Sequence, residues 1–333
     1  MEPRIQYLAT YTTEKDVLGE PGRFRKFILG EPEYAELGKP YGVTLHEGKL
    51  FICDTRNGAV VIFDLAARAT EVMGSTEAAQ LRKPVNIAID DDGTRYVVDA
   101  VHRRLMVYDR NNAYVRSIGD PNAWKPTDAA VFGRRLYVTD ILNAQVVVLD
   151  RETGAELQRI SRKGSGAGEL FLPTNVDVDR HGNVYVSDTG NFRVLKFDRE
   201  GRLVRQFGEL GRALGRFARP KGIAIDRDDR LYVVDSAFEN VQIFDQNGDL
   251  LLYFGAAGNG KGALNIPAKV EIDYANVGLF SDSVAPGYAL EYLILVSSQF
   301  GRNKVNVYGF LEQSKDGEES VSHVDSSTTA GDQ

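Results

Sequence analysis

The sequence predicts an all-β protein, a six-bladed β-propeller built from four-stranded antiparallel blades. Residues 171–208 contain four short apolar alternations separated by tight polar turns, which is the pattern of four strands. A Pro-x-x-apolar anchor recurs at six places, 42 to 47 residues apart. In five of the six units an aspartate closes the second strand, and an apolar or aromatic residue stands nine positions later.

These anchors set the order of the units along the chain. The prolines are Pro40, Pro84, Pro126, Pro173, Pro220 and Pro267; the aspartates are Asp54, Asp99, Asp140, Asp188 and Asp235; the partners nine residues on are Phe63, Tyr108, Leu149, Phe197 and Phe244. The sixth unit has Ser297, Ser298 or Gln299 in place of the aspartate. Because the same aspartate recurs in five blades, we interpret it as an acceptor for backbone N–H groups in a turn and not as a catalytic group.

Three segments, RPKGIAID (219–226), LYVVD (231–235) and NVQIF (240–244), resemble the NHL-repeat family. The resemblance covers residues 39–311 and implies a six-bladed propeller of the NHL type. It leaves the function open, because NHL propellers serve several unrelated functions. Similar NHL proteins are often exported, but no signal peptide precedes the first residues here. The chain as written is therefore expected to be cytoplasmic, or else a mature form with a start residue restored.

Residues 1–38 precede the first full unit and are expected to close the ring. Phe24–Leu29 resembles the outermost strands of other units, and the sixth unit lacks such a strand. We therefore predict that Phe24–Leu29 supplies the fourth strand of the last blade and removes its open edge. Ile5–Thr10 is a competing candidate for this place, or an additional edge strand.

The six blades are predicted near residues 39–74, 83–119, 125–160, 171–208, 218–255 and 266–311, with glycine-rich links between them. The last blade carries an insertion, Tyr274–Glu291, where other units have a tight turn. Such an insertion maps to a loop on one face, where it either binds a partner or caps the seam of the ring. Residues 312–333 are acidic and poor in large apolar side chains, so we expect a disordered tail.

Composition excludes several classes of protein. A single propeller domain accounts for the 333 residues, and no apolar run approaches the roughly 18 residues of a membrane span. The single cysteine, Cys53, excludes an intrachain disulfide, and its place on an apolar strand favours a buried structural thiol. Much of the net charge of −7 falls in the tail, so the body of the protein is nearly neutral. We expect a monomer.

Alternation along the innermost strands predicts which residues lie near the central channel. Two positions after the anchor prolines stand Gly42, Asn86, Asp128, Asn175, Gly222 and Lys269, and four positions after them stand Thr44, Ala88, Ala130, Asp177, Ala224 and Glu271. The channel is either only solvated, or it holds a ligand. The oxygens of Asn86, Asp128, Asn175, Asp177 and Glu271 suit a hard cation such as Ca²⁺, which Lys269 would repel.

Two enzyme families set alternatives to a binding role. Six-bladed lactonases of the gluconolactonase type use Glu, Asn and Asp around a channel metal, which implies a metal-dependent hydrolase as the second interpretation, although their sequence motifs are absent here. Peptide-amidating lyases with an NHL propeller gather histidines around zinc. His46, His102, His181 and His323 are expected on different faces or in the tail, so we predict no zinc site, no catalytic residue and no resident cofactor.

Basic residues gather in the links between blades and point to a third possibility. The candidates for a basic rim on the top face are Arg162, Lys163, Arg212, Arg216 and Arg219. NHL domains that bind RNA use a basic top face, but aromatic residues are scarce in these links, so nucleic acid is not the favoured partner. The leading hypothesis is a non-enzymatic binding or scaffold protein that presents its top face and channel mouth to a protein or another macromolecule.

Overall fold

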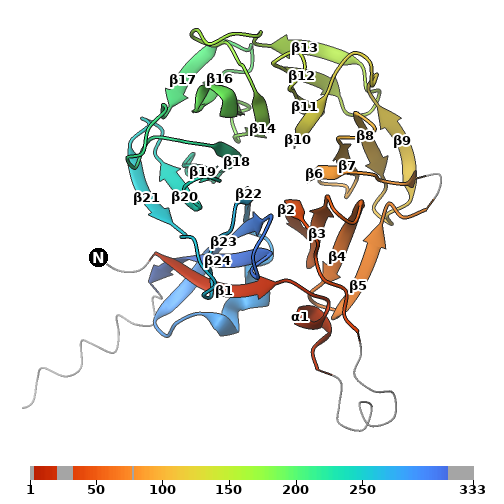
Figure 1. The fold of residues 1–333 in the computed structure, drawn as a ribbon, viewed down its shortest axis with the longest axis vertical. Helices are drawn as coiled ribbons and strands as arrows, with labels where there is room; N and C mark the ends of the chain where they lie inside the picture. Colours follow the sequence, from red (N-terminus) through yellow and green to blue (C-terminus); the bar gives the residue numbers. More distant parts are fainter. Residues whose placement is uncertain (1–3, 21–32, 77–78, 314–333) are drawn as a thin grey trace, which may run out of the picture.

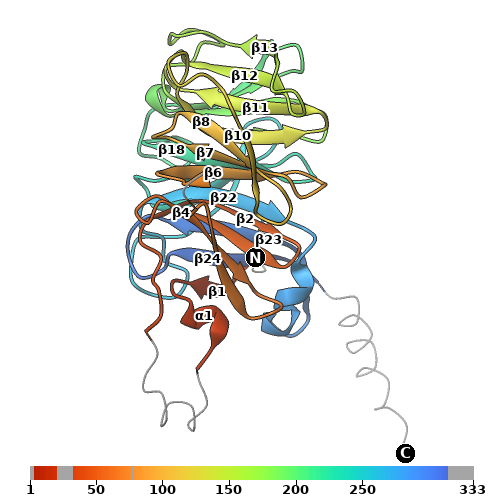
Figure 2. The ribbon, with the colours of Figure 1, turned by 90° about the vertical axis from the view of Figure 1, so that its right-hand side faces the viewer.

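The computed structural model describes residues 4–20, 33–76 and 79–313, and it confirms the predicted fold. Six four-stranded antiparallel sheets surround a central axis, with β2, β6, β10, β14, β18 and β22 innermost (Figure 1). The strands run across the thickness of the disc (Figure 2). No helix within the described residues is long and apolar enough to cross a membrane.

The blades follow one another along the chain. Blade one holds β2 (Pro40–His46), β3 (Lys49–Asp54), β4 (Ala59–Asp64) and β5 (Ala69–Met73), and blade two holds β6 (Pro84–Ile89), β7 (Arg95–Asp99), β8 (Arg104–Tyr108) and β9 (Tyr114–Ile118). Blade three holds β10 (Pro126–Phe132), β11 (Arg135–Asp140), β12 (Gln145–Asp150) and β13 (Glu156–Ile160). Blade four holds β14 (Pro173–Val178), β15 (Val184–Asp188), β16 (Arg193–Phe197) and β17 (Leu203–Phe207). Blade five holds β18 (Pro220–Ile225), β19 (Leu231–Asp235), β20 (Asn240–Phe244) and β21 (Leu250–Phe254).

Blade six combines both ends of the chain. It holds β22 (Pro267–Asp273), β23 (Tyr288–Ser298), β24 (Val305–Gln313) and, as its outermost strand, β1 (Ile5–Tyr11). Within the described residues, the other elements are the short helix α1 (Lys15–Leu18) and two 3₁₀ turns, η2 (Thr189–Asn191) and η3 (Val277–Ser283).

Each anchor proline begins an innermost strand and pairs with the last residue of the second strand, as Pro173 does with Asp188. Proline suits the first position of a strand because it has no N–H to donate. The register shifts directly after the proline in all six blades, which marks a β-bulge. Such a bulge re-aims the side chains that follow it, here beside the axis. The links and the turns between second and third strands share one face, the top face.

The motif aspartates hold this top face together. Asp54 accepts hydrogen bonds from the backbone N–H groups of Gly38 and Lys39 in the link and of Arg56 and Asn57 in the turn. Asp99, Asp140, Asp188 and Asp235 accept the same kind of bond from their own links, and all five side chains are fully buried. The interpretation of these residues as turn acceptors is confirmed.

An apolar side chain from each link packs under the top face, and we call it the link plug. The plugs are Leu37, Leu81, Trp124, Leu170, Phe217 and Leu264, and all are buried. Four of them, Leu81, Trp124, Phe217 and Leu264, fit closely because a glycine directly follows the preceding outermost strand: a Cβ on Gly208 would lie 2.3 Å from the ring of Phe217. Five of the six plugs stand three residues before the anchor proline, a regular spacing that sequence reasoning missed.

An N-terminal strand closes the ring, as predicted, but it is the competing candidate at Ile5–Thr10 and not the preferred one. β1, not Phe24–Leu29, pairs antiparallel with β24, from Ile5 opposite Phe310 to Tyr11 opposite Val305 (Figure 1). Phe24–Leu29 lies outside the described residues, and β1 occupies the edge of β24 where Phe24–Leu29 was predicted to pair. The physical reason is packing on both faces of β1, since the ring of Tyr7 meets that of Tyr308 edge-on at 6.2 Å while Tyr11 contacts the core beside Phe63.

The insertion of the last blade packs at the seam of the ring. Asn276 accepts a hydrogen bond from the backbone N–H of Gly48 in blade one, and Phe280 is buried in the core that blades one and six share. The side chain of Gln6 bonds to Ser283 and Ala285, so the insertion also holds the closing strand. β24 continues to Gln313, two residues beyond the predicted blade end, and the predicted tail from 314 on lies outside the described residues.

Candidate functional site

The channel is crossed near its top by a buried ion pair. Lys269 on β22 of blade six reaches Asp128 on β10 of blade three, the opposite blade, with 3.2 Å between Nζ and Oδ2. Both side chains are buried. Glycines stand at the matching positions of the two flanking blades, Gly42 and Gly222, and a Cβ on Gly222 would lie 2.5 Å from the Cα of Lys269. The small neighbours allow the long side chain to cross the axis.

Hydrogen bonds around Asp128 connect blades two, three and four. Its Oδ2 accepts a hydrogen bond of 2.9 Å from the side chain of Asn175, and its Oδ1 accepts one from the backbone of Ala129. Asn86 donates to the backbone carbonyl of Thr127 at 3.0 Å. The amide oxygens of Asn86 and Asn175 are buried and have no hydrogen-bond partner among the described residues. The layer thus holds one balanced ion pair and two unused acceptors.

A second layer below it contains Asp177 and Glu271, both partly exposed. Asp177 accepts hydrogen bonds from the backbone N–H groups of Val178 and Ile225, and Glu271 lies 3.4 Å from the hydroxyl of Thr44. Burial raises the pKa of Asp177 to about 6 and that of Glu271 to about 8, although the Lys269 ammonium opposes both shifts. Burial alone would lower the pKa of Lys269, but the three carboxyl groups raise it above its usual range. At neutral pH Glu271 is mostly protonated, and Lys269 is balanced by Asp128.

Glu271→Gln should change how stability depends on pH. Since the folded pKa of Glu271 is raised, its contribution to stability is full below the unfolded pKa of about 4.5 and is lost as the pH rises through about 8. Glutamine resembles the protonated acid, so the variant should match the wild type near pH 5 and exceed it near pH 9 in the free energy of unfolding. Urea denaturation at both pH values measures this, with the exposed Glu47→Gln as control. A variant less stable than the wild type at high pH would contradict the prediction.

The top mouth of the channel is spanned by a second contact. Lys221 of blade five donates a hydrogen bond of 3.0 Å to the hydroxyl of Tyr41 in blade one, and its ammonium lies 5.3 Å from the centre of that ring. Blades one and five are not neighbours, so this contact bridges blade six at the mouth. Together with the pair of Lys269 and Asp128, it places two lysine side chains across the upper part of the channel.

The predicted channel residues are therefore brought together in two layers. Asn86, Asp128, Asn175 and Lys269 form the upper one, and Asp177 and Glu271 form the lower one. Within the described residues, no three His, Cys, Asp or Glu side chains are placed to share a metal ion. His102 contacts the backbone of Gln80 and His181 lies near Asp229, so these histidines stand apart, and His323 lies outside the described residues.

The basic-rim candidates all stand exposed on two links of the top face. Arg162 pairs with Glu169 at 3.0 Å and Arg216 with Glu209 at 2.9 Å. Exposed apolar side chains share these links and the neighbouring turns, namely Val101, Leu142, Phe171, Leu172, Leu210, Leu214 and Phe300. The sequence analysis did not single them out as a surface feature. Large apolar residues in a glycine-rich link that lacks the alternation of a strand indicate an exposed apolar patch, and such patches often bind other proteins.

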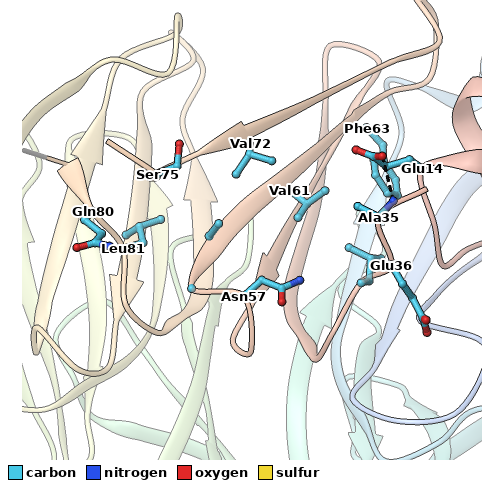
Figure 3. Close-up of a pocket in the computed structure, with 14 residues that line it drawn as sticks. Glu14, Ala35, Glu36, Asn57, Val61, Phe63, Val72, Ser75, Gln80 and Leu81 are labelled. Atoms are coloured by element: carbon cyan, nitrogen blue, oxygen red, sulfur yellow. Dashed lines mark hydrogen bonds between the residues drawn. The ribbon is translucent and has the colours of Figure 1, made fainter. Parts of the chain in front are cut away.

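Among the described residues, three pockets lie away from the channel. The largest of these three, about 310 Å³, covers the outer part of blade one between the segment 35–37 and the link residues Gly74, Ser75, Gln80 and Leu81 (Figure 3). A second, about 230 Å³, lies against blade three beside Trp124. The third, about 220 Å³, lies beside the first turn of blade two, where Asp90 pairs with Arg151 at 2.8 Å.

Comparisons with known proteins agree on the fold. A family model described as a 6-bladed beta-propeller matches residues 126–207. Protein brain tumor of Drosophila melanogaster is 23% identical over 134 residues, which is 39% of this chain and 13% of that protein. The chain thus spans only a small part of this relative.

Solved structures of different activity share the architecture. A gluconolactonase of Xanthomonas campestris superposes with a TM-score of 0.61 at 15% identity, covering 94% of this chain and 99% of that one. A streptogramin B lyase gives 0.56 at 13% identity, covering 84% and 85%. A chain of the nidogen/laminin complex gives 0.57 at 16% identity, covering 75% and 92%. Identities this low show a shared fold alone.

Proposed function

We propose that the protein is a non-enzymatic binding or scaffold propeller of the NHL type that presents its top face and channel mouth to another protein. The observation that carries the proposal is the mixture of exposed cationic and apolar side chains on the loops of this face. The exposed cations are Arg56, Arg82, Lys83, Arg103, Lys125, Arg162, Lys163, Arg212, Arg216, Arg219, Lys261 and Arg302. The links also carry exposed acids, such as Glu36, Asp120 and Glu209, but cations outnumber them. In the turns of the opposite face exposed acids are more frequent, among them Glu47, Asp91, Asp92, Asp228 and Asp249.

This composition suits a protein interface better than a nucleic-acid one. Arginine and large apolar side chains are enriched where proteins bind each other, and loops held on a rigid ring supply them at little entropic cost. Single-stranded nucleic acid needs aromatic platforms for its bases, and the single tryptophan, Trp124, is buried as a link plug. The contact of Lys221 with Tyr41 places side chains at the mouth of the channel, where a partner can meet them.

Arg212→Glu combined with Leu214→Asp should weaken binding of the partner protein to the top face. Both side chains are exposed on one link, so the variant should fold normally while binding weakens at least about tenfold. Affinity purification from the source cells, followed by quantitative mass spectrometry, compares this variant with the wild type. Arg110→Glu with Leu279→Asp makes the same chemical change on exposed residues outside the top face and should retain the partner. Partners retained equally by both variants would refute the proposal, and loss on nuclease treatment would point to RNA.

A metal-dependent hydrolase is the second candidate. The shifted pKa values of Asp177 and Glu271 and the unused amide oxygens of Asn86 and Asn175 favour it, together with the fold shared with a gluconolactonase. The Lys269 ammonium argues against it, because it already balances Asp128. Bound Ca²⁺ at a hundredfold excess over its dissociation constant would stabilise the fold by about 2.7 kcal/mol. A chelator-sensitive melting temperature that Asp128→Asn with Asp177→Asn abolishes would favour this candidate over the first.

A further inference from the structure

In four blades a polar side chain of the third strand holds the link that leads into that blade. Arg193 of blade four donates to the carbonyls of Gly166 and Glu169 at 2.9 and 2.8 Å. The other three cases are Tyr108 to Ala79, Gln242 to Gly215 and Arg216, and Asn306 with Tyr308 to Ala263 and Gly262. These bonds draw each link down onto the sheet.

Blades one and three show no such bond from the third strand among the described residues. At the equivalent positions β4 presents Ala59, Val61 and Phe63, whose side chains cannot hydrogen-bond to a link. Gln145 of β12 bonds to Asp140 instead, within its own blade. The two larger pockets lie over these two blades. In these two blades no described hydrogen bond from the third strand draws the link onto the sheet, and a groove lies beside the link.

The blade-one groove has an apolar floor and two walls. Val61 and Val72 form the floor, with Leu81, Gln80 and Ser75 on one side and Ala35 on the other (Figure 3). Val72 is 50% exposed although it lies on a strand. An apolar ligand would cover this side chain, and a volume of about 310 Å³ is at the lower end of the range for small-molecule sites.

The charged residues that line the groove indicate the charge of its ligand. None of the 14 lining residues is basic, and two of them, Glu14 and Glu36, are carboxylates at one end. The Glu36 carboxylate points away from the floor (Figure 3) and interacts with the ammonium of Lys304, so Glu14 is the carboxylate that a ligand would meet. Glu14 is held in place, since its oxygens accept hydrogen bonds of 3.1 Å from the backbone of Ala35 and the hydroxyl of Thr70. We infer that this groove binds an organic cation with an apolar body, such as an aralkyl amine or the adjoining basic and aromatic side chains of a peptide.

Three probes with the same phenyl body test the inference: phenethylamine, 2-phenylethanol and phenylacetate carry positive, zero and negative charge. Protein-observed NMR titration should give phenethylamine the tightest dissociation constant, on the order of 1 mM for a fragment of this size. Glu14→Gln should weaken phenethylamine about two- to fivefold at low salt, as expected for a partly exposed ion pair. N-acetyl-phenylalanyl-arginine amide is the peptide arm, and the tighter of the two cations identifies the source of the natural ligand.

Filling the groove provides the decisive variant. Val72→Trp places a large side chain on the exposed floor and should abolish binding of phenethylamine while far-UV circular dichroism stays unchanged. Arg159→Trp is the matched change in the blade-three groove, because Arg159 is exposed and pairs with Val147 as Val72 pairs with Val61, and it should leave binding at blade one intact. Equal affinity for the three phenyl probes, or binding that survives Val72→Trp, would overturn the inference. Neither variant alters Arg212 or Leu214, so failure here is distinct from failure of the proposed top-face function.

Discussion

Deletion of residues 1–11 should destroy the cooperative fold of the ring. The deletion removes β1, uncovers the edge of β24 and exposes the faces of Tyr308 and Phe310. Each large apolar side chain that loses its burial costs about 1.5–3 kcal/mol, so several of them together approach the whole stability of a domain, about 5–15 kcal/mol. Urea denaturation followed by circular dichroism should show a large loss of stability, or a chain that aggregates through the open edge.

Deletion of residues 314–333 is the matched control, because it shortens the other terminus and leaves every described strand intact. It should keep the melting temperature within about 1–2 °C. If the chain without residues 1–11 unfolded like the full chain, another segment would have to pair with β24. Phe24–Leu29, whose sequence resembles an outermost strand, would then be the first to examine.

Asp128→Ala should be the most damaging single substitution in the channel. It leaves the buried ammonium of Lys269 without its partner and removes the acceptor for the amide of Asn175. Breaking a buried ion pair by removing one member costs about 3–5 kcal/mol. Lys269→Met combined with Asp128→Leu removes both charges and keeps most of the volume, so it should be much less destabilising than Asp128→Ala.

A double-mutant cycle of wild type, Asp128→Leu, Lys269→Met and the double variant, with the four unfolding free energies measured near pH 7, gives the coupling between the two sites. A coupling above about 1 kcal/mol would be expected for two groups in direct contact. Asp128→Ala within about 0.5 kcal/mol of the wild type would mean that the ion pair does not form across the axis.

The strand framework was predictable because local chemistry repeats. Each anchor proline starts an innermost strand, and each motif aspartate binds the link and turn beside it. Both residue types therefore recur at a regular spacing in the sequence, where they can be recognised. The closing strand was not predictable in the same way. Ile5–Tyr11 and Phe24–Leu29 both alternate like strands, and the choice rests on contacts such as Tyr7 with Tyr308, which are 301 residues apart in the chain.

The channel residues were likewise predictable only in part. Alternation placed Asp128 and Lys269 near the axis, but nothing local shows that one side chain reaches the opposite blade. The blade-one groove also depends on comparison between blades. Val61 looks like an ordinary strand residue until the structure shows that Gln242, at the equivalent place in blade five, holds a link.

The ion pair between Lys269 and Asp128 also constrains how this chain can evolve. Propellers grow and shrink by duplication or loss of single blades, but an odd-numbered ring has no blade opposite another. Inserting one blade into either half would displace Asp128 from Lys269 and leave a buried ammonium unpaired. Descendants with five or seven blades therefore have to lose this lysine first, so the salt bridge makes six blades the number that mutation most easily preserves.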